Sequence, residues 1–216
     1  MILPDLRGHG RSPAPEGKYS MQEMAADILR IMDENSIERS ILVGNSMGGY
    51  VSLAFAEHFP ERLSGLALIA SHVFADSAYK KSTRLADVEK IRQTSVTEVL
   101  SDMPERLSRH PDVIEFCRER IAGADATGMI GVLGGMAERA DAANTFSTLK
   151  VPAVIIAGQE DQFIPIDLSR RMAQLMEEPR LVEIPNAGHL PMLDDPQLTY
   201  LALYKFIAQI EEQNNR

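Results

Sequence analysis

Short apolar runs that alternate with helical stretches constrain the fold of this chain more than any other feature of its sequence. Five runs have the length and composition of buried strands, and they cover residues 2–3, 41–43, 66–70, 151–157 and 181–184. Apart from Glu183 they are apolar instead of alternating with polar residues, which is typical of parallel strands that helices cover on both faces. Strands that alternate with helices predict the α/β class, with a mostly parallel sheet flanked by helices.

Capping residues indicate where three of the helices begin. Ser20, followed by Glu23 three residues later, forms a capping-box pattern. Asp167 can cap a helix that ends near residue 176, and Asp195 followed by Pro196 is a typical helix start. The last helix then has one apolar face, which is formed by Leu198, Leu201, Phe206, Ile207 and Ile210.

The stretch from residue 72 to residue 144 departs from this alternation. It has helical periodicity and no convincing strand, and it lies between two expected strands of one sheet. We therefore expect a helical cap inserted into a single α/β core. The expected organisation is a first part of the core at residues 1–71, the helical cap at residues 72–144 and a second part of the core at residues 145–216.

The composition excludes several classes of protein. Asp and Glu outnumber Lys and Arg by 31 to 22, and the resulting net charge of −9 argues against a nucleic-acid-binding protein, which needs a basic surface. No apolar stretch approaches the ~20 residues of a membrane span, and the first residues show no signal peptide. The single cysteine, Cys117, cannot form an internal disulfide. We expect a cytoplasmic globular protein that binds neither nucleic acid nor a membrane.

The segment Gly44-Asn45-Ser46-Met47-Gly48 matches the pattern G-x-S-x-G. In this pattern the serine lies on a sharp turn between a strand and a helix, above the edge of a sheet. An expected strand precedes the segment and an apolar helical stretch follows it, so the context supports the match. We expect a side chain at either glycine to collide with the neighbouring strand or helix. Ser46 is therefore the candidate nucleophile.

A serine needs a base to act as a nucleophile, and the base is usually a histidine that a carboxylate orients. His189 lies in a loop between the strand at 181–184 and the last helix, and Asp161 follows the strand at 151–157. Both loops leave the carboxyl ends of strands, where open α/β sheets place their sites. Asp161 and His189 are therefore the candidate acid and base, with Glu160 as the neighbouring alternative acid.

Together these motifs resemble those of the α/β-hydrolase superfamily along the whole chain. Residues 3–12 look like the loop after the family's fourth strand, residues 45–49 like the nucleophile turn, residues 158–161 like the acid loop and residues 187–189 like the histidine loop. The order serine, acid, histidine is also the order of the family's catalytic triad. The resemblance implies hydrolysis of an ester, lactone, thioester or carbon–carbon bond, with no metal and no organic cofactor. A serine at position 46 argues against the dehalogenase and epoxide hydrolase branches.

The sequence departs from the family at its front. The family has three strands before the segment that opens this sequence, and a His-Gly-type loop after the third strand helps to bind the oxyanion. The backbone N–H of Met47 is the oxyanion donor that this sequence provides. Losing one such donor can cost about 10²–10³ in rate, so a catalytically impaired binding or assembly module is an alternative function. An in-frame strand pattern with a His-Gly loop in the DNA upstream of Met1 would favour the enzyme.

The same departure leaves the strand at 41–43 at an edge of the sheet. An apolar strand at an exposed edge can pair with another chain. We therefore expect a homo-oligomer that forms through this edge.

The leading hypothesis is a serine hydrolase that cleaves a small carboxylic ester or lactone through an acyl-enzyme on Ser46. A carbon–carbon bond hydrolase of the same fold is the alternative within the family. Residues of the cap and of the strand ends are expected to line the substrate pocket and to set the size of the acyl group. These candidates are His72, Phe74, Met129, Leu133, Phe163 and Leu190.

Overall fold

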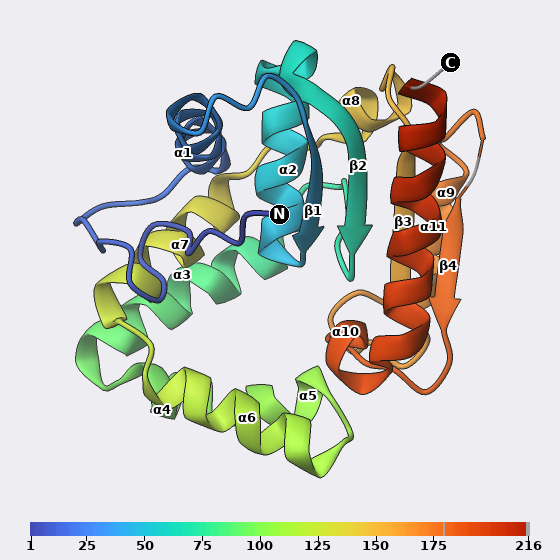
Figure 1. Cartoon of the computed structure of the whole chain (residues 1–216). Helices are drawn as coiled ribbons and strands as arrows, with labels where there is room; N and C mark the ends of the chain where they lie inside the picture. Colours follow the sequence, from blue (N-terminus) through green and yellow to red (C-terminus); the bar gives the residue numbers. More distant parts are fainter. Residues whose placement is uncertain (179, 215–216) are drawn as a thin grey trace.

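A parallel sheet organises the chain. The computed structural model describes residues 1–178 and 180–214, and within them the sheet has four strands: β1 (Ser40–Asn45), β2 (Leu63–Ile69), β3 (Ala153–Gly158) and β4 (Leu181–Ile184). The strands lie in the order β1-β2-β3-β4, and all neighbouring pairs are parallel (Figure 1). All four strands therefore end at the same edge of the sheet, as the α/β class requires.

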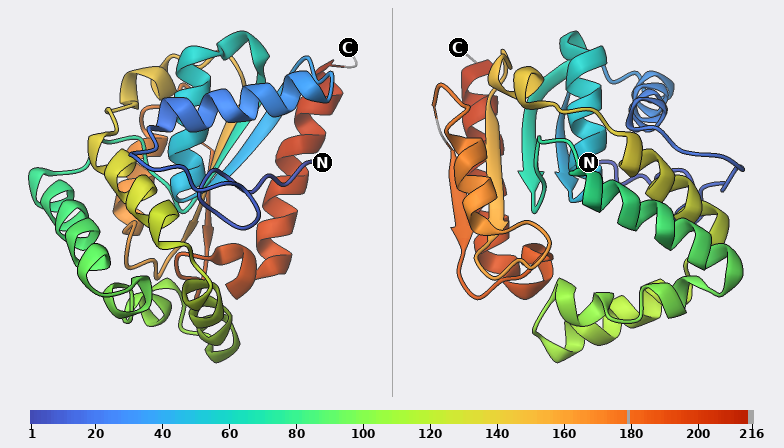
Figure 2. Two further views of the ribbon diagram at one scale, coloured as in Figure 1. Left: turned by 90° about the vertical axis from the view of Figure 1, so that its left-hand side faces the viewer. Right: turned by 180° about the vertical axis from the view of Figure 1, so that it is seen from behind.

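The two faces of the sheet are covered by different helices. α1 (Met21–Glu34), α2 (Met47–His58) and α9 (Ile166–Ala173) lie on one face, while α11 (Pro196–Asn214) covers the other (Figures 1 and 2). Alternate residues of β2 contact the two layers, because Leu66 and Leu68 pack toward α2 whereas Ala67 and Ile69 pack toward α11. Parallel crossovers are right-handed, so strands added in one direction place their connecting helices on one face.

Helices alone occupy the chain between β2 and β3, all of which the structure describes. This helical segment contains α3 (Ala78–Gln93), α4 (Val96–Val99), α5 (Met103–Leu107), α6 (Pro111–Ala122), α7 (Ala126–Glu138) and α8 (Ala143–Ser147). In Figure 1, α4, α5 and α6 lie beyond the tips of the strands, while α3 runs beside α7. None of the helices in the described ranges is long and apolar enough to cross a membrane.

The first expected strand does not form. Residues 2–3 have no strand conformation, and the side chains of Ile2 and Leu3 are 45% and 83% exposed. A run of two residues can make too few ladder hydrogen bonds to offset the conformational entropy lost on ordering it. The other four runs all lie within or overlap the observed strands.

Two helix expectations are also corrected. α1 begins with the expected capping box at Ser20, but α9 begins at Ile166 with Pro165 as its N-cap, so Asp167 lies in the first turn, and the helix ends at Ala173. In α11 the cap is as expected, because Asp195 accepts a hydrogen bond from the Leu198 amide. The apolar face of α11 is rotated, however: Leu198 and Leu201 are 41% and 43% exposed, and the buried side chains are Ala202, Phe206 and Ile210.

β1 is an edge strand. Its hydrogen-bonded neighbour among the described strands is β2, and the Val43 side chain is 47% exposed. A hollow of about 490 Å³ runs along this edge, between β1, the opening residues and α1. Pairing of this edge with a second copy of the chain stays a prediction.

Small 3₁₀ and α-helical turns complete the fold. The 3₁₀ turn η1 (Pro60–Arg62) leads into β2, and α10 (Pro191–Asp194) precedes α11. α10 follows the loop that leaves the carboxyl end of β4. It therefore lies beside the edge of the sheet where the candidate site is expected.

Candidate active site

Ser46 occupies the sharp turn between β1 and α2. Its backbone has φ 50° and ψ −114°, a conformation that is rare for a residue with a side chain. The glycines with no room for a side chain are not the pair, Gly44 and Gly48, that the sequence led us to expect. A Cβ on Gly44 would lie 2.3 Å from the Gly48 carbonyl oxygen, and one on Gly49 would lie 2.3 Å from Ser71 Oγ, whereas a Cβ on Gly48 would meet nothing within 4 Å. The turn thus needs glycine at positions 44 and 49, since Gly48 faces open space.

Ser46, His189 and Asp161 form a continuous hydrogen-bonded chain. His189 Nε2 lies 2.8 Å from Ser46 Oγ, and His189 Nδ1 lies 2.8 Å from Asp161 Oδ2. The other carboxylate oxygen of Asp161 accepts hydrogen bonds from the amides of Phe163 and Ile164. Asp161 and His189 are only 7% and 5% exposed. Every oxygen of the buried carboxylate therefore has a partner, and the imidazole is held between the acid and the serine.

The topology explains why three residues so far apart in sequence meet. Ser46 follows β1, Asp161 follows β3 and His189 follows β4, so all three lie at the carboxyl edge of the sheet. The alternative acid, Glu160, instead forms an ion pair of 2.7 Å with Arg109. The carboxylate that contacts the imidazole is that of Asp161.

The helical segment holds the histidine loop from the outside. The His189 amide donates to the Leu107 carbonyl at the end of α5, at 2.8 Å. Asp194 accepts a hydrogen bond from the Gly188 amide at 2.7 Å, and the Ser108 hydroxyl donates to the same carboxylate. These contacts could not be predicted from the sequence, because they depend on how α5 docks against the loop.

The six expected pocket residues fall into three groups. Phe163 and Leu190 adjoin the histidine: the Phe163 ring centroid lies 5.0 Å from that of His189, and Leu190 is the next residue. Met129 packs between the sheet-facing core and the contact of α3 with α7. Leu133 is buried inside that contact with Val88 and Ile91, so its side chain belongs to the interior of the helical segment.

His72 and Phe74 lie on the loop that follows β2. The His72 ring is buried, 5.4 Å from the Tyr50 ring and 6.5 Å from the Phe74 ring, and its Nε2 lies 3.2 Å from Arg139 Nη2. Burial and the Arg139 charge lower the pKa of His72 to about 3. His72 is therefore neutral at pH 5 and above.

Sequence reasoning missed a group of charged side chains beside His72. The carboxylate of Asp76 is fully buried and accepts from Arg84 Nε at 2.6 Å and from Arg139 Nη2 at 2.9 Å. The four-residue spacing of Asp76, Lys80 and Arg84 could have been noticed as one face of a helix. The contact between Arg139 and Asp76 could not have been noticed in the sequence, because it depends on tertiary packing.

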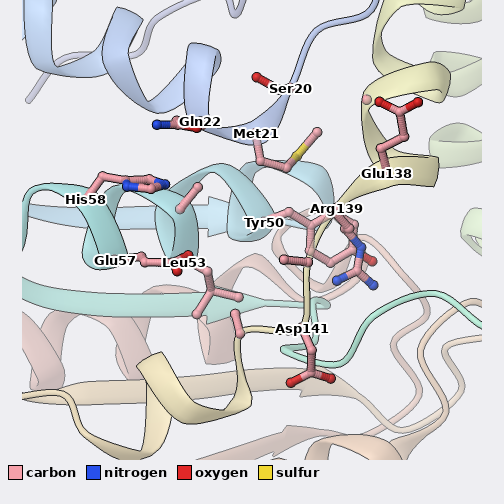
Figure 3. A pocket seen from close by; sticks show the side chains of 14 residues that line it. Ser20, Met21, Gln22, Tyr50, Leu53, Glu57, His58, Glu138, Arg139 and Asp141 are labelled. Atoms are coloured by element: carbon pink, nitrogen blue, oxygen red, sulfur yellow. The ribbon is translucent and has the colours of Figure 1, made fainter.

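Arg139 also borders a second hollow of about 260 Å³, between the start of α1, α2 and the end of α7 (Figure 3). Its guanidinium lies over the Tyr50 ring, with 3.9 Å between its central carbon and the ring centroid. The residues that line this hollow include Glu57, Glu138 and Asp141, and none of them belongs to the group formed by Ser46, Asp161 and His189. The hollow is thus a feature separate from the candidate active site.

Comparisons with known proteins agree with this fold. A family model described as alpha/beta hydrolase fold matches residues 1–107. A thermophilic esterase from Thermogutta terrifontis, solved with malate bound, is 33% identical with a TM-score of 0.92, and the match covers 96% of this chain and 79% of that one.

Two enol-lactonases are also similar. The structure of the enol-lactonase from Burkholderia xenovorans LB400 is 25% identical with a TM-score of 0.85, covering 94% of this chain and 78% of that one. The 3-oxoadipate enol-lactonase 2 of Acinetobacter baylyi is 26% identical over 202 residues, which are 91% of this chain and 74% of that protein. The chain therefore belongs to the α/β-hydrolase family and is an enzyme of the hydrolase type.

Proposed function

We propose that the chain is a serine hydrolase that cleaves a small carboxylic ester or lactone through an acyl-enzyme on Ser46. The observation that carries the proposal is the pair of 2.8 Å contacts that link Ser46, His189 and Asp161 in the order nucleophile, base and acid. In this arrangement the base can take the serine proton without moving, and the buried carboxylate fixes the imidazole and stabilises its cation.

In the first half of the reaction, His189 Nε2 takes the proton of Ser46 Oγ as this oxygen attacks the carbonyl carbon of the substrate. The tetrahedral intermediate collapses when the bond to the leaving oxygen breaks, and His189 gives its proton to that alkoxide. In the second half, His189 takes a proton from water, whose oxygen attacks the acyl carbon. The proton returns to Ser46 Oγ as the acid leaves.

The Met47 amide is the proposed donor to the oxyanion. Met47 is the first residue of α2, so its N–H has no intrahelical acceptor and lies at the positive end of the helix dipole. A donor at this position can stabilise the negative charge of the tetrahedral intermediate.

An esterase and two enol-lactonases among its relatives support the ester and lactone classes for this chain. The helical segment is the proposed cap, inserted between the parts of the core at residues 1–71 and 145–216. Phe163 is the proposed wall of the acyl pocket next to His189, because the two rings are in contact. Carbon–carbon bond cleavage and a non-catalytic module are the competing functions.

Covalent labelling tests the nucleophile. A fluorophosphonate probe should label the parent protein on Ser46, and the variant Ser46→Ala should show no labelling. The matched control is Ser64→Ala, because Ser64 lies at the opposite, amino end of β2. Equal labelling of Ser46→Ala and the parent contradicts the proposal.

A substrate panel then separates the competing functions. The panel contains p-nitrophenyl esters, small lactones and a vinylogous diketone that reports carbon–carbon cleavage. Turnover of esters or lactones that is lost in Ser46→Ala supports the proposal. Turnover of the diketone alone favours the carbon–carbon hydrolase, and absence of both turnover and labelling favours the non-catalytic module.

A further inference from the structure

A cluster of three basic side chains and one carboxylate lies beside the candidate active site. We call Lys80, Arg84, Arg139 and Asp76 the cation cluster. The Asp76 carboxylate is paired with both guanidinium groups, and its side chain is fully buried. Among the described residues, the Lys80 ammonium forms no ion pair. The cluster therefore holds three basic side chains and a single carboxylate.

Lys80 and Arg84 point toward the interior from the first turns of α3. They are one helical turn apart, and the same face of α3 continues through Val88 and Ile91, which are buried against α7. Tyr79, on another face of the first turn, is 82% exposed. Lys80 thus lies in the first turn of α3, on the side of the helix that faces the rest of the protein.

A short series of contacts connects the cluster to the nucleophile. The Ser71 hydroxyl donates to the Ser46 carbonyl oxygen at 2.8 Å, and the next residue, His72, contacts Arg139. Arg139 also stacks on Tyr50, which is four residues after Ser46 on α2 (Figure 3).

Lys80 is half-buried, as expected for a residue on the inner side of α3. Burial and the Arg84 charge lower the pKa of Lys80, while the carboxylates of Asp76 and Asp161 partly oppose this shift. The ammonium is therefore partly removed from water.

Nearby acidic groups do not balance the cluster. Glu138 pairs with Lys18, and the two carboxylate oxygens of Asp141 accept hydrogen bonds from the amides of Ala75 and Ala143. His72, with its low pKa, adds no charge. An excess of positive charge in a partly buried region is costly unless an anion joins it, and it is conspicuous in a chain with a net charge of −9.

We propose that the cation cluster binds a carboxylate of the substrate, so that the preferred substrate is an ester or lactone that carries a free carboxylate. This inference rests on the proposed function and names its substrate class. Lys80 is the side chain that contacts the substrate carboxylate. Arg84 and Arg139 are positioning residues. They hold the Asp76 carboxylate in place, and their positive charges attract the substrate carboxylate without contacting it.

The kinetic test compares a matched pair of substrates: the mono-p-nitrophenyl ester of glutaric acid, which is an anion, and p-nitrophenyl pentanoate, which is neutral. The parent should have the larger kcat/KM on the anionic ester. Lys80→Met should lower the ratio of anionic to neutral kcat/KM by about 10- to 100-fold, the range expected for loss of a hydrogen-bonded ion pair. Lys80→Arg should keep most of the ratio.

Lys90→Met is the control, since Lys90 is an exposed residue in the last turn of the same helix, and its ratio should equal that of the parent. Titration calorimetry with glutarate provides a readout that needs no turnover: the parent and Lys90→Met should bind glutarate more tightly than Lys80→Met does. An unchanged ratio in Lys80→Met, or equal glutarate binding by Lys80→Met and the parent, overturns the inference. Glutarate binding that depends on Lys80 without any hydrolysis contradicts the proposed function alone.

Discussion

The proposed triad of Ser46, His189 and Asp161 and the cation cluster are two groups of polar and charged side chains beside the same edge of the sheet, and they differ in how their charges are balanced. Asp161 has a partner on each oxygen, and His189 is held on both ring nitrogens. In the cation cluster, the Asp76 carboxylate forms ion pairs with two arginines, and Lys80 has no ion pair among the described residues. Side chains whose charges and hydrogen bonds are all paired hold one fixed geometry. A cluster with an unpaired charge can instead attract a ligand of the opposite charge.

The largest expected effect comes from breaking the balance of the triad. In Asp161→Asn the uncharged amide no longer holds the proton of the imidazole on Nδ1. The His189 ring is then in the wrong tautomer to accept the serine proton on Nε2. We expect kcat on a p-nitrophenyl ester to fall by about 10⁴, with the fold retained by circular dichroism. Glu160→Gln is the control, because Glu160 pairs with Arg109, and it should stay within a few-fold of the parent. A similar loss in both variants would refute the assignment of Asp161.

The proton acceptor gives the next largest effect. A protonated His189 cannot take the serine proton, so kcat/KM should fall about tenfold per pH unit on the acid limb. His72 cannot cause this limb, because its pKa of about 3 keeps it neutral there. The measurement is kcat/KM of the parent between pH 5 and 8. A flat profile would remove His189 as the base.

The contact between the helical segment and the histidine loop should have a smaller effect. Ser108 is 2% exposed and donates to Asp194, which in turn holds the Gly188 amide. Ser108→Ala should lower the free energy of unfolding by about 1–3 kcal/mol, because the half-buried carboxylate of Asp194 loses a donor. The measurement is urea unfolding with kcat/KM recorded alongside. Ser147→Ala, at an exposed position on α8, should change the stability far less; equal losses would show that the Ser108 contact does not secure the loop.

The same comparison shows what the sequence could predict. Ser46, Asp161 and His189 each follow an apolar run, so strand order and parallel topology were enough to bring their loops to one edge. The glycine argument was right for Gly44 and wrong for Gly48, because the sequence does not reveal which glycine of the turn contacts Ser71.

The cation cluster was beyond sequence reasoning for a physical reason. Its members come from the loop after β2, from α3 and from the end of α7, and they meet only because α3 packs beside α7. The same packing buries Leu133, which the sequence presented as a pocket residue. Periodicity predicts that a helical residue is buried, but it does not say which neighbour covers it.

The smallest expected effect tests whether the cluster's excess charge acts on its neighbours. His72 has its pKa lowered from 6.5 to about 3, chiefly by burial and then by Arg139. Between these two values the unfolded chain binds a proton at this histidine that the folded chain does not. The His72 contribution to stability is therefore complete above pH 6.5 and is lost progressively as the pH falls toward 3, at up to about 1.4 kcal/mol per pH unit.

His72→Asn removes the side chain that binds a proton in the unfolded chain but not in the folded one. The unfolding free energy of this variant should therefore depend less steeply on pH than that of the parent. Urea unfolding at pH 6.5, 5.5 and 4.5 measures the slope, which is independent of any constant loss of stability that the substitution causes. His110→Asn, at an exposed position, should keep the parent slope. Equal slopes for His72→Asn and the parent would mean that the folded chain protonates His72 as easily as the unfolded chain does. Neither burial nor the Arg139 charge would then lower the pKa of His72, and the evidence for an unbalanced positive charge at this position would be lost.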